Sequence, residues 1–553
     1  MPAVYGSLDI HSISSRFVYS AEAKAEEGTE DNKSNCFKYV PSLGEKTGNT
    51  LRPTLFTCGY RAPKVVDRKI ISLRQLVTGT DFENAWTLDT PVLLANAKIG
   101  EGAGHVLTAT LYEEQANRGR LGVIYCTNRP SRIVAFPLGR GDDHMEEANR
   151  LQGTFDEFAR DPRQERLSWR SCQVLRHGPK GHTCHMLATP EGGAHANISY
   201  LHMFNKASTG PVSFTKLTLD VSHRVFQQIS QRWECAFARG IVDGIFPTAT
   251  IDQPVIATPL LNSDGTRTDE LSHESFLLMN GIKDFRVGCY VISLGRAESA
   301  IETPVRASFL QGIEVVATDA RKKMVFKVAD SATPESILLG SFDLHKLVFE
   351  DSNVSFGKTD VVTLFNGAEY LQGCLGRLLH PESGLPASHD LVCSTDDLSM
   401  KEAGRGGSTL PVVTIQRQDA VSKSQPVILM PHGGPHSCLT DWFWPSTATL
   451  ALMGFRIVIP NYVGSIGGTR EYVEALIGHC GTKDVQDCMK VLENLSELGS
   501  LDRNQVYISG GSHGGFLTAH LIGKYPSTFR AAQLRNPVID IATMVATTDI
   551  PDW

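Results

Sequence analysis

Five residues near the C-terminal end of the chain have the types and the spacing of a nucleophilic catalyst. Gly510-Gly511-Ser512-His513-Gly514 follows the pattern G-x-S-x-G and comes directly after the apolar run Gln505–Ser509. In this pattern a sharp turn between a strand and a helix presents a serine hydroxyl for attack on a carbonyl carbon. The turn strains the serine backbone, and a side chain at Gly510 or Gly514 would collide with the strand or the helix. We therefore predict that Ser512 is a catalytic nucleophile, with a phosphate-binding turn as the alternative.

A second glycine-rich segment supports this chemistry. His432-Gly433-Gly434-Pro435 directly follows the apolar run Pro426–Met430. An H-G-G loop in this position lets a backbone N–H point at the negative oxygen that develops during acyl transfer. We predict an oxyanion hole formed by the backbone N–H groups of Gly434 and His513. Taken alone, the loop could also be a simple turn.

The histidines of the chain do not provide a base for Ser512. We expect the His513 side chain to point away from the hydroxyl and His520 to face along the helix. His432 and His436 flank the glycine loop and are expected to be structural. No histidine follows His520, and the acids after Ser512 are Asp540, Asp549 and Asp552. A serine hydroxyl is a weak nucleophile without a base, so the chain holds no complete proton relay.

Composition excludes several classes of function. The 553 residues are too many for one core and predict two to four domains. A net charge of −7 makes nucleic acid and anionic membranes improbable partners. No apolar stretch is long enough to span a bilayer, and the first residues do not have the pattern of a secretion signal. The twelve cysteines have no framework spacing, which favours reduced thiols and a cytoplasmic protein.

One group of metal-binding residue types occurs in the first half of the chain. A zinc site there could use Cys172, His177, His182, Cys184 and His185. Their spacing matches no usual zinc finger. We interpret the group as a surface loop rich in histidine and expect neither a metal nor another cofactor.

Residues 1–395 are predicted to form a β-rich domain. Short apolar or alternating runs are separated by turn residues, which is typical of a propeller, a sandwich or a barrel, and we favour a β-propeller. The predicted strands include Leu121–Cys126, Arg132–Phe136, Val212–Val221, Phe285–Leu294, Gly312–Ala317, Lys323–Val328, Ile337–Leu339, Leu344–Phe349 and Val361–Phe365.

Residues 396–553 are predicted to form an incomplete α/β-hydrolase domain, because strands and helices alternate as in a parallel sheet. Apolar residues of Lys483–Leu495 fall on one helical face. The expected strands are Pro426–Met430, Phe455–Ile459, Gln505–Ser509 and Ala531–Leu534, and a further helix is expected at Phe516–Tyr525.

Several of these segments resemble the acylaminoacyl-peptidase family, which are serine peptidases of the prolyl oligopeptidase clan. The resemblance is strong from about residue 426 onward and weak before it, where Leu121–Arg129 shows a weak similarity. It is carried by Met430–Ser437, Asn461–Ser465, Gly510–Phe516, Arg535–Val538 and Thr548–Trp553.

The resemblance implies a β-propeller ahead of an α/β-hydrolase domain. It implies release of an N-acylated residue from the N-terminus of short blocked peptides, with the propeller as a filter against folded proteins. It further implies a cytosolic homo-oligomer without a cofactor. Ser512 matches the family nucleophile, and Gly434 and His513 match its oxyanion positions.

The chain departs from the family pattern in two places. Val463 stands where the family usually has arginine. The family's catalytic aspartate and histidine, and its last sheet strands, lie beyond Trp553, so we expect a truncated sequence of an active enzyme. A dipeptidyl peptidase, a carboxylesterase or a non-catalytic propeller scaffold with a decayed hydrolase half are the alternatives.

Overall fold

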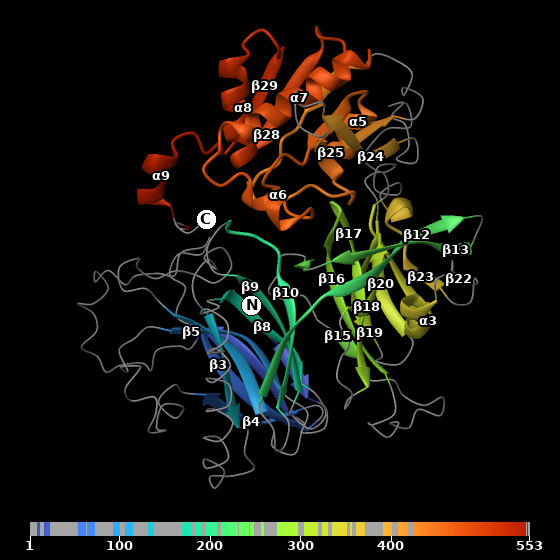
Figure 1. Cartoon of the computed structure of the whole chain (residues 1–553), viewed down its shortest axis with the longest axis vertical. Coiled ribbons are helices and arrows are strands. Elements are labelled where there is room, and N and C mark those ends of the chain that lie inside the picture. The colour runs from blue at the N-terminus through green and yellow to red at the C-terminus, as the bar shows by residue number, and fades with distance from the viewer. Residues whose placement is uncertain are drawn as a thin grey trace.

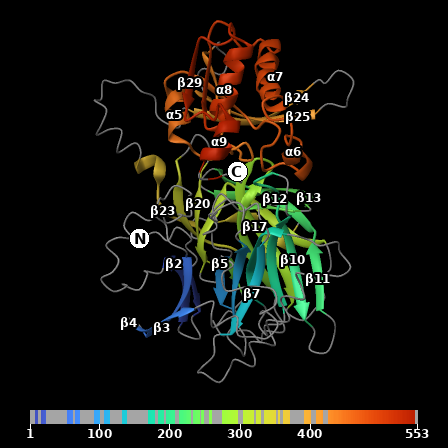
Figure 2. The same cartoon turned by 90° about the vertical axis from the view of Figure 1, so that its left-hand side faces the viewer.

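The computed structural model describes residues 425–548 and residue 550. Between residues 8 and 417 it describes the elements named below and short stretches that adjoin them. Figures 1 and 2 show β-sheets, coloured blue to yellow, at one end of the molecule and a mixed α/β unit, coloured orange and red, at the other. None of the helices in the described part combines the length with the apolar character needed to cross a membrane.

The first part of the chain folds into antiparallel sheets of consecutive strands. Alternating apolar residues and short turns favour this arrangement, because neighbouring strands can pair directly. Three sheets are built in this way: β1 (Leu8–His11) to β2 (Arg16–Glu22), β3 (Pro53–Arg61) and β4 (Lys64–Ile71); β5 (Val92–Ile99), β6 (Val106–Glu113) and β7 (Ser131–Pro137); and β8 (Trp169–His177), β9 (Thr183–Pro190), β10 (Tyr200–Lys206) and β11 (Val212–Leu217).

The structure describes two further sheets in this part. In the larger one, a parallel pairing between β12 and β18 interrupts the antiparallel order. It contains β12 (Leu219–Ile229), β13 (Arg232–Val242), β14 (Phe246–Pro247), β15 (Ile256–Thr258), β16 (Glu274–Lys283), β17 (Arg286–Arg296), β18 (Val305–Gln311) and β22 (Val354–Phe356). The smaller sheet contains β19 (Ile313–Thr318), β20 (Lys323–Val328), β21 (Ser336–Ser341) and β23 (Val361–Phe365).

Most of the predicted strands that lie in the described part are confirmed, and one prediction is wrong. Leu344–Phe349 is the helix α3 and not a strand. The Asp343 side chain caps it by accepting a hydrogen bond from the Lys346 backbone N–H at 3.1 Å. Leu344, Leu347 and Val348 are buried on one side, which is the spacing of a helix. The predicted strand Leu121–Cys126 lies outside the described residues.

The C-terminal part is organised around one sheet with helices on both faces, as the alternation of strands and helices predicts. The strand order is β24-β25-β27-β26-β28-β29; the last four run parallel and the first two join them antiparallel. The strands are β24 (Leu391–Met400), β25 (Ser408–Arg417), β26 (Val427–Leu429), β27 (Arg456–Pro460), β28 (Val506–Gly511) and β29 (Ala531–Arg535).

Apolar packing fixes the helices on this sheet. The predicted apolar face of α7 (Lys483–Glu497) is buried together with α8 (His513–Lys524) on one side of the sheet. Ala448 and Ala451 of α5 (Pro445–Leu452) pack on the other side. Two shorter helices are α6 (Arg470–Glu474) and α9 (Ile541–Thr547). The predicted boundary between residues 395 and 396 stays a prediction and falls within β24.

Polar contacts and a small apolar cluster join the two parts of the chain. Asp441 accepts hydrogen bonds from the Val287 backbone at 3.3 Å and from Gln311 Nε2 at 3.2 Å, and lies 3.7 Å from Arg286 Nη1. Burial raises the pKa of Asp441, and Arg286 opposes this shift. The apolar cluster contains Ala194, Ile198, Phe246, Ile282, Ile466 and Val473. The larger sheet and the α/β unit are therefore packed together.

Candidate active site

Ser512 occupies the turn between β28 and α8, as the sequence predicts. Its backbone has φ 55° and ψ −122°, a conformation that is unfavourable for a residue with a side chain. The surrounding strand and helix hold it there, and strain of this kind is typical of functional turns. Ser512 is exposed, whereas the residue that follows it is buried. Ser512 is therefore accessible to solvent.

The glycines around Ser512 are required by close backbone contacts. A Cβ on Gly510 would lie 2.1 Å from the Gly514 carbonyl oxygen. A Cβ on Gly514 would lie 2.1 Å from the Pro431 carbonyl oxygen, which belongs to the segment leading into the glycine loop. Both distances are far below van der Waals contact, so a side chain would collide at either position. At Gly510 it would collide with the helix, as predicted, whereas at Gly514 it would collide with the segment leading into the glycine loop and not with the strand or the helix.

The H-G-G loop lies directly against the nucleophile. A Cβ on Gly433 would be 3.3 Å from Ser512 Cβ and 3.9 Å from Ser512 Oγ. Gly434 has φ +128°, which a residue with a side chain rarely adopts, and its peptide bond to Pro435 is cis. A backbone without side chains therefore faces the serine, as an oxyanion hole requires. The assignment of the Gly434 and His513 N–H groups as the two donors stays a prediction.

His432 holds the glycine loop to the segment Asn461–Ser465. Its Nε2 lies 2.8 Å from Ser465 Oγ, and its ring stacks on Tyr462 at a centroid distance of 4.4 Å. Tyr462 donates a hydrogen bond from its hydroxyl to the His432 carbonyl at 2.8 Å. Complete burial lowers the pKa of His432 from 6.5 to about 4. His432 is thus a neutral structural residue near neutral pH, which agrees with its predicted role.

This burial gives a testable pH dependence. Between the folded pKa of about 4 and the unfolded pKa of 6.5, the unfolded chain binds more protons at His432 than the folded chain. The contribution of neutral His432 to the free energy of unfolding is therefore fully present above pH 6.5. It is lost as the pH falls toward 4, and the loss is about 3 kcal/mol in total. We expect the pH slope of the unfolding free energy in this window to be smaller in His432→Asn than in the unchanged protein. Equal slopes would contradict the buried neutral state.

His436 and Val463 show how the rest of the framework is held. His436 Nδ1 lies 2.8 Å from the Gly464 carbonyl oxygen, so this imidazole is also structural, as predicted. The Val463 backbone N–H donates to Asp487 Oδ2 at 3.0 Å. Burial raises the pKa of Asp487, while this hydrogen bond and Lys490 oppose the shift. Val463 stands at the position where the family pattern has arginine. Its backbone and the nearby Lys490 both bind Asp487.

The segment Arg535–Val538 completes the frame on the other side of Ser512. The Ser512 N–H donates to the Arg535 carbonyl at 2.9 Å, and the Ser512 carbonyl accepts from the Val538 N–H at 3.4 Å. A Cβ on Gly511 would lie 3.2 Å from the Arg535 guanidinium. Two segments that are distant in the sequence, the glycine loop and Arg535–Val538, therefore meet at Ser512.

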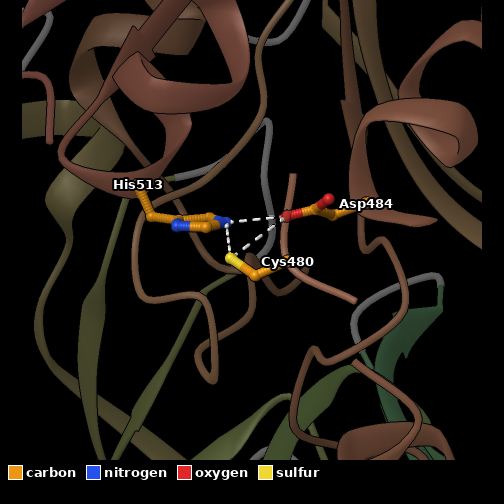
Figure 3. A group of neighbouring side chains, drawn as sticks. All are labelled: Cys480, Asp484 and His513. Atoms are coloured by element: carbon orange, nitrogen blue, oxygen red, sulfur yellow. Dashed lines mark hydrogen bonds and ion pairs between the residues drawn. The ribbon is translucent and has the colours of Figure 1, made fainter. Parts of the chain in front are cut away.

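The His513 side chain is turned into the protein. Its Nε2 lies 3.0 Å from Asp484 Oδ2 and 3.9 Å from Cys480 Sγ (Figure 3). His513 and Asp484 are both buried, and His520 packs its ring on Phe516 at 4.3 Å. Sequence reasoning missed Asp484 and Cys480. The only signal was their spacing of four residues at the start of a helix, which does not reveal that His513 lies beside them.

The other residues considered from the sequence lie in other elements or outside the described residues. Asp540 caps α9 by accepting a hydrogen bond from the Thr543 N–H at 3.1 Å, and Asp549 and Asp552 lie outside the described residues. The interpretation of the cysteine and histidine group as a loop is wrong for four of its members. Cys172 and His177 lie in β8, and Cys184 and His185 lie in the paired strand β9; His182 is outside the described residues.

Comparison with known proteins finds relatives of the segment that holds this site. Residues 442–553, which include Ser512, match the prolyl oligopeptidase family. The chain is similar to acylamino-acid-releasing enzyme 2 of Oryza sativa subsp. japonica, with 44% identity over 159 residues. The acylamino-acid-releasing enzymes of Sus scrofa and Homo sapiens are each 42% identical over 148 residues. The resemblance to acylaminoacyl peptidases is therefore confirmed.

The matches cover a limited part of each relative. The Oryza match spans 29% of this chain and 20% of that protein, and the Sus scrofa match spans 27% and 20%. Solved structures are similar in fold over nearly the whole chain. A Pyrococcus horikoshii acylaminoacyl peptidase has a TM-score of 0.55 at 14% identity, covering 99% of this chain and 65% of that one. Prolyl oligopeptidase B from Galerina marginata has a TM-score of 0.53 at 12% identity, covering 100% and 58%.

Proposed function

We propose that the protein is a serine hydrolase that releases an N-acylated, typically N-acetylated, amino acid from the N-terminus of short blocked peptides. The observation that carries the proposal is the exposed Ser512 in a strained turn against the H-G-G loop. The sequence similarity to acylamino-acid-releasing enzymes supports the substrate class.

In the proposed mechanism Ser512 Oγ attacks the carbonyl carbon of the acylated residue. The new C–O bond moves the carbonyl electrons onto oxygen, where the N–H groups of Gly434 and His513 stabilise the negative charge. The peptide amine leaves with a proton, and water then hydrolyses the acyl-enzyme.

The base that accepts the serine proton is not one of the histidines described at the turn. His432, His436 and His513 are each bound to other groups, and no histidine follows His520 in the chain. The family resemblance implies an aspartate and a histidine C-terminal to Trp553 for this role. The proposed activity therefore requires a base other than these three histidines.

The β-rich part has a proposed role as a filter. The antiparallel sheets formed by β1 to β23 support a β-propeller, which would admit short peptides and exclude folded proteins. The family resemblance further supports a homo-oligomer in the cytoplasm that acts without a cofactor. The net charge of −7 supports the absence of nucleic-acid and membrane partners.

The deciding experiment is covalent labelling of the full-length gene product with a fluorophosphonate probe. We expect one adduct at Ser512 and no adduct in Ser512→Ala, because only an activated serine reacts. Equal labelling of both proteins would reject the proposal. Turnover of acetyl-alanyl peptides, peptides with a free Ala-Pro N-terminus and simple esters then separates the proposed peptidase from a dipeptidyl peptidase and a carboxylesterase.

A non-catalytic scaffold is the second candidate, because His432, His436 and His513 are each bound to groups other than Ser512. Sequencing the transcript beyond the codon for Trp553 distinguishes the two candidates. A reading frame that continues into an aspartate and then a histidine, in the order Ser…Asp…His, favours the hydrolase. An in-frame stop codon at that point favours the scaffold.

A further inference from the structure

Three different side-chain donors meet beside the nucleophile turn. Cys480 lies just before α7, Asp484 is in its first turn, and His513 is the first residue of α8 (Figure 3). Cys480 Sγ is 3.9 Å from His513 Nε2 and 3.8 Å from Asp484 Oδ2, and the nitrogen and oxygen are 3.0 Å apart. One thiol, one imidazole and one carboxylate thus converge on a single point.

The arrangement is not a proton relay of the Cys-His-Asp kind. A relay needs the nucleophile on one ring nitrogen and the carboxylate on the other, so that the carboxylate orients the imidazole while the first nitrogen accepts the proton of the nucleophile. Here Cys480 and Asp484 both approach the same nitrogen, Nε2 of His513. Figure 3 shows the other ring nitrogen facing away from both groups. The three donors therefore share a centre, which is the geometry of metal ligands.

The separations of the donor atoms fit a small tetrahedral ion. With Zn–S of about 2.3 Å and Zn–N and Zn–O of about 2.1 Å, tetrahedral angles require about 3.6 Å from sulfur to each of the others and about 3.4 Å from nitrogen to oxygen. The separations here are 3.9, 3.8 and 3.0 Å. Each differs from the required value by about 0.4 Å or less. A rotation of the Cys480 side chain can supply the change in the two sulfur distances, and a small shift of the Asp484 or His513 side chain can supply the change in the nitrogen–oxygen distance.

The surroundings hold the donors in place for such an ion. Asp484 is completely buried, and its Oδ1 accepts the Val485 N–H at 2.9 Å, which directs Oδ2 toward the other donors. His513 is also buried, whereas Cys480 is exposed and leaves a side open for entry and for a water as fourth ligand. A thiolate and a carboxylate together balance a charge of two, and a sulfur donor selects against magnesium and calcium.

We propose that Cys480, Asp484 and His513 form a binding site for a zinc ion. The site differs from the Cys172 to His185 group and departs from our expectation that the chain binds no metal. It does not include Ser512, although His513 is the next residue. A bound ion would tie the loop before α7 to the first residue of α8, and so to the nucleophile turn.

The test is zinc binding by the purified, chelator-treated protein in competition with a chromophoric chelator. We expect one zinc ion per chain, unaffected by excess magnesium, and a cobalt–thiolate charge-transfer band when Co²⁺ replaces zinc. Cys480→Ser is conservative at an exposed position, and should weaken zinc binding at least tenfold and remove the band. Asp484→Asn should weaken binding as well.

His520→Gln is the matched control, because His520 offers an imidazole near the same loop without joining the three donors. A Cβ on Gly481 would lie 3.7 Å from its Nε2. We expect its zinc affinity to stay within twofold of the unchanged protein. The proposal is overturned if the unchanged protein binds no zinc, if its cobalt form has no thiolate band, or if Cys480→Ser binds zinc as before.

Discussion

Replacing Gly514 by alanine should destabilise the protein by about 3 kcal/mol and abolish covalent labelling at Ser512. The added Cβ would lie 2.1 Å from the Pro431 carbonyl oxygen and 3.0 Å from the His432 carbonyl oxygen. Both are backbone atoms at the start of the glycine loop and cannot rotate away. The helix α8 would have to move away from the loop, and this would separate Ser512 from Gly434, the predicted oxyanion donor in the loop. Chemical denaturation and fluorophosphonate labelling measure the two effects.

Gly523→Ala is the matched control for this substitution. Gly523 lies in the same helix, but a Cβ there would meet nothing within 4 Å. Alanine should leave labelling unchanged and raise the unfolding free energy by up to about 1 kcal/mol, because it is the better helix former. If Gly514→Ala behaved like Gly523→Ala, the close packing of the elbow on the loop would be disproved.

The local part of the site could be predicted because its signals lie within a few residues of each other. Gly510, Ser512 and Gly514 define a strand, a turn and a helix in one short segment, and the structure contains all three. The apolar face of α7 could be predicted for the same reason, since five buried residues repeat at helical spacing. The prediction for Leu344–Phe349 failed because a six-residue segment with four apolar residues fits a strand or a helix equally well. The capping by Asp343 decides in favour of the helix.

The contacts that could not be predicted connect segments that are distant in the sequence. Asp484 and Cys480 precede His513 by 29 and 33 residues, and only the packing of α7 beside α8 brings them together. The same is true of Asp441, whose partners Arg286 and Gln311 lie more than a hundred residues earlier. Sequence patterns contain information on residue types and their spacing. Neither of these predicts the sheet order that creates these contacts.

The histidines illustrate why residue type alone does not assign chemistry. His432, His436 and His513 all lie close to Ser512 in the sequence or in space, yet each is bound to a different structural partner. Their imidazoles fix the glycine loop, the Asn461–Ser465 segment and the start of α8. The turn is therefore positioned by a buried polar framework, and the removal of one partner should be costly.

Asp484→Ala provides the sharpest test of that framework, with an expected loss of about 3 kcal/mol in unfolding free energy. Asp484 is completely buried, and its carboxylate contacts both His513 Nε2 and the Val485 N–H. Alanine would leave the buried imidazole nitrogen without this partner, which costs about 1 to 3 kcal/mol, and would add a cavity. The measurement is made with a chelator present, so that zinc adds nothing to the stability of either protein.

Two variants separate the buried contact from a general effect of charge on α7. Glu493→Ala removes an acidic group from an exposed position of the same helix, and its effect should stay within about 0.5 kcal/mol. Asp484→Asn keeps an oxygen that can face His513 and should lose less stability than Asp484→Ala. A loss in Asp484→Ala no larger than that in Glu493→Ala would mean that the Asp484–His513 contact does not hold the two helices together. Because His513 is the residue after the nucleophile, the loss we expect should be accompanied by slower labelling of Ser512.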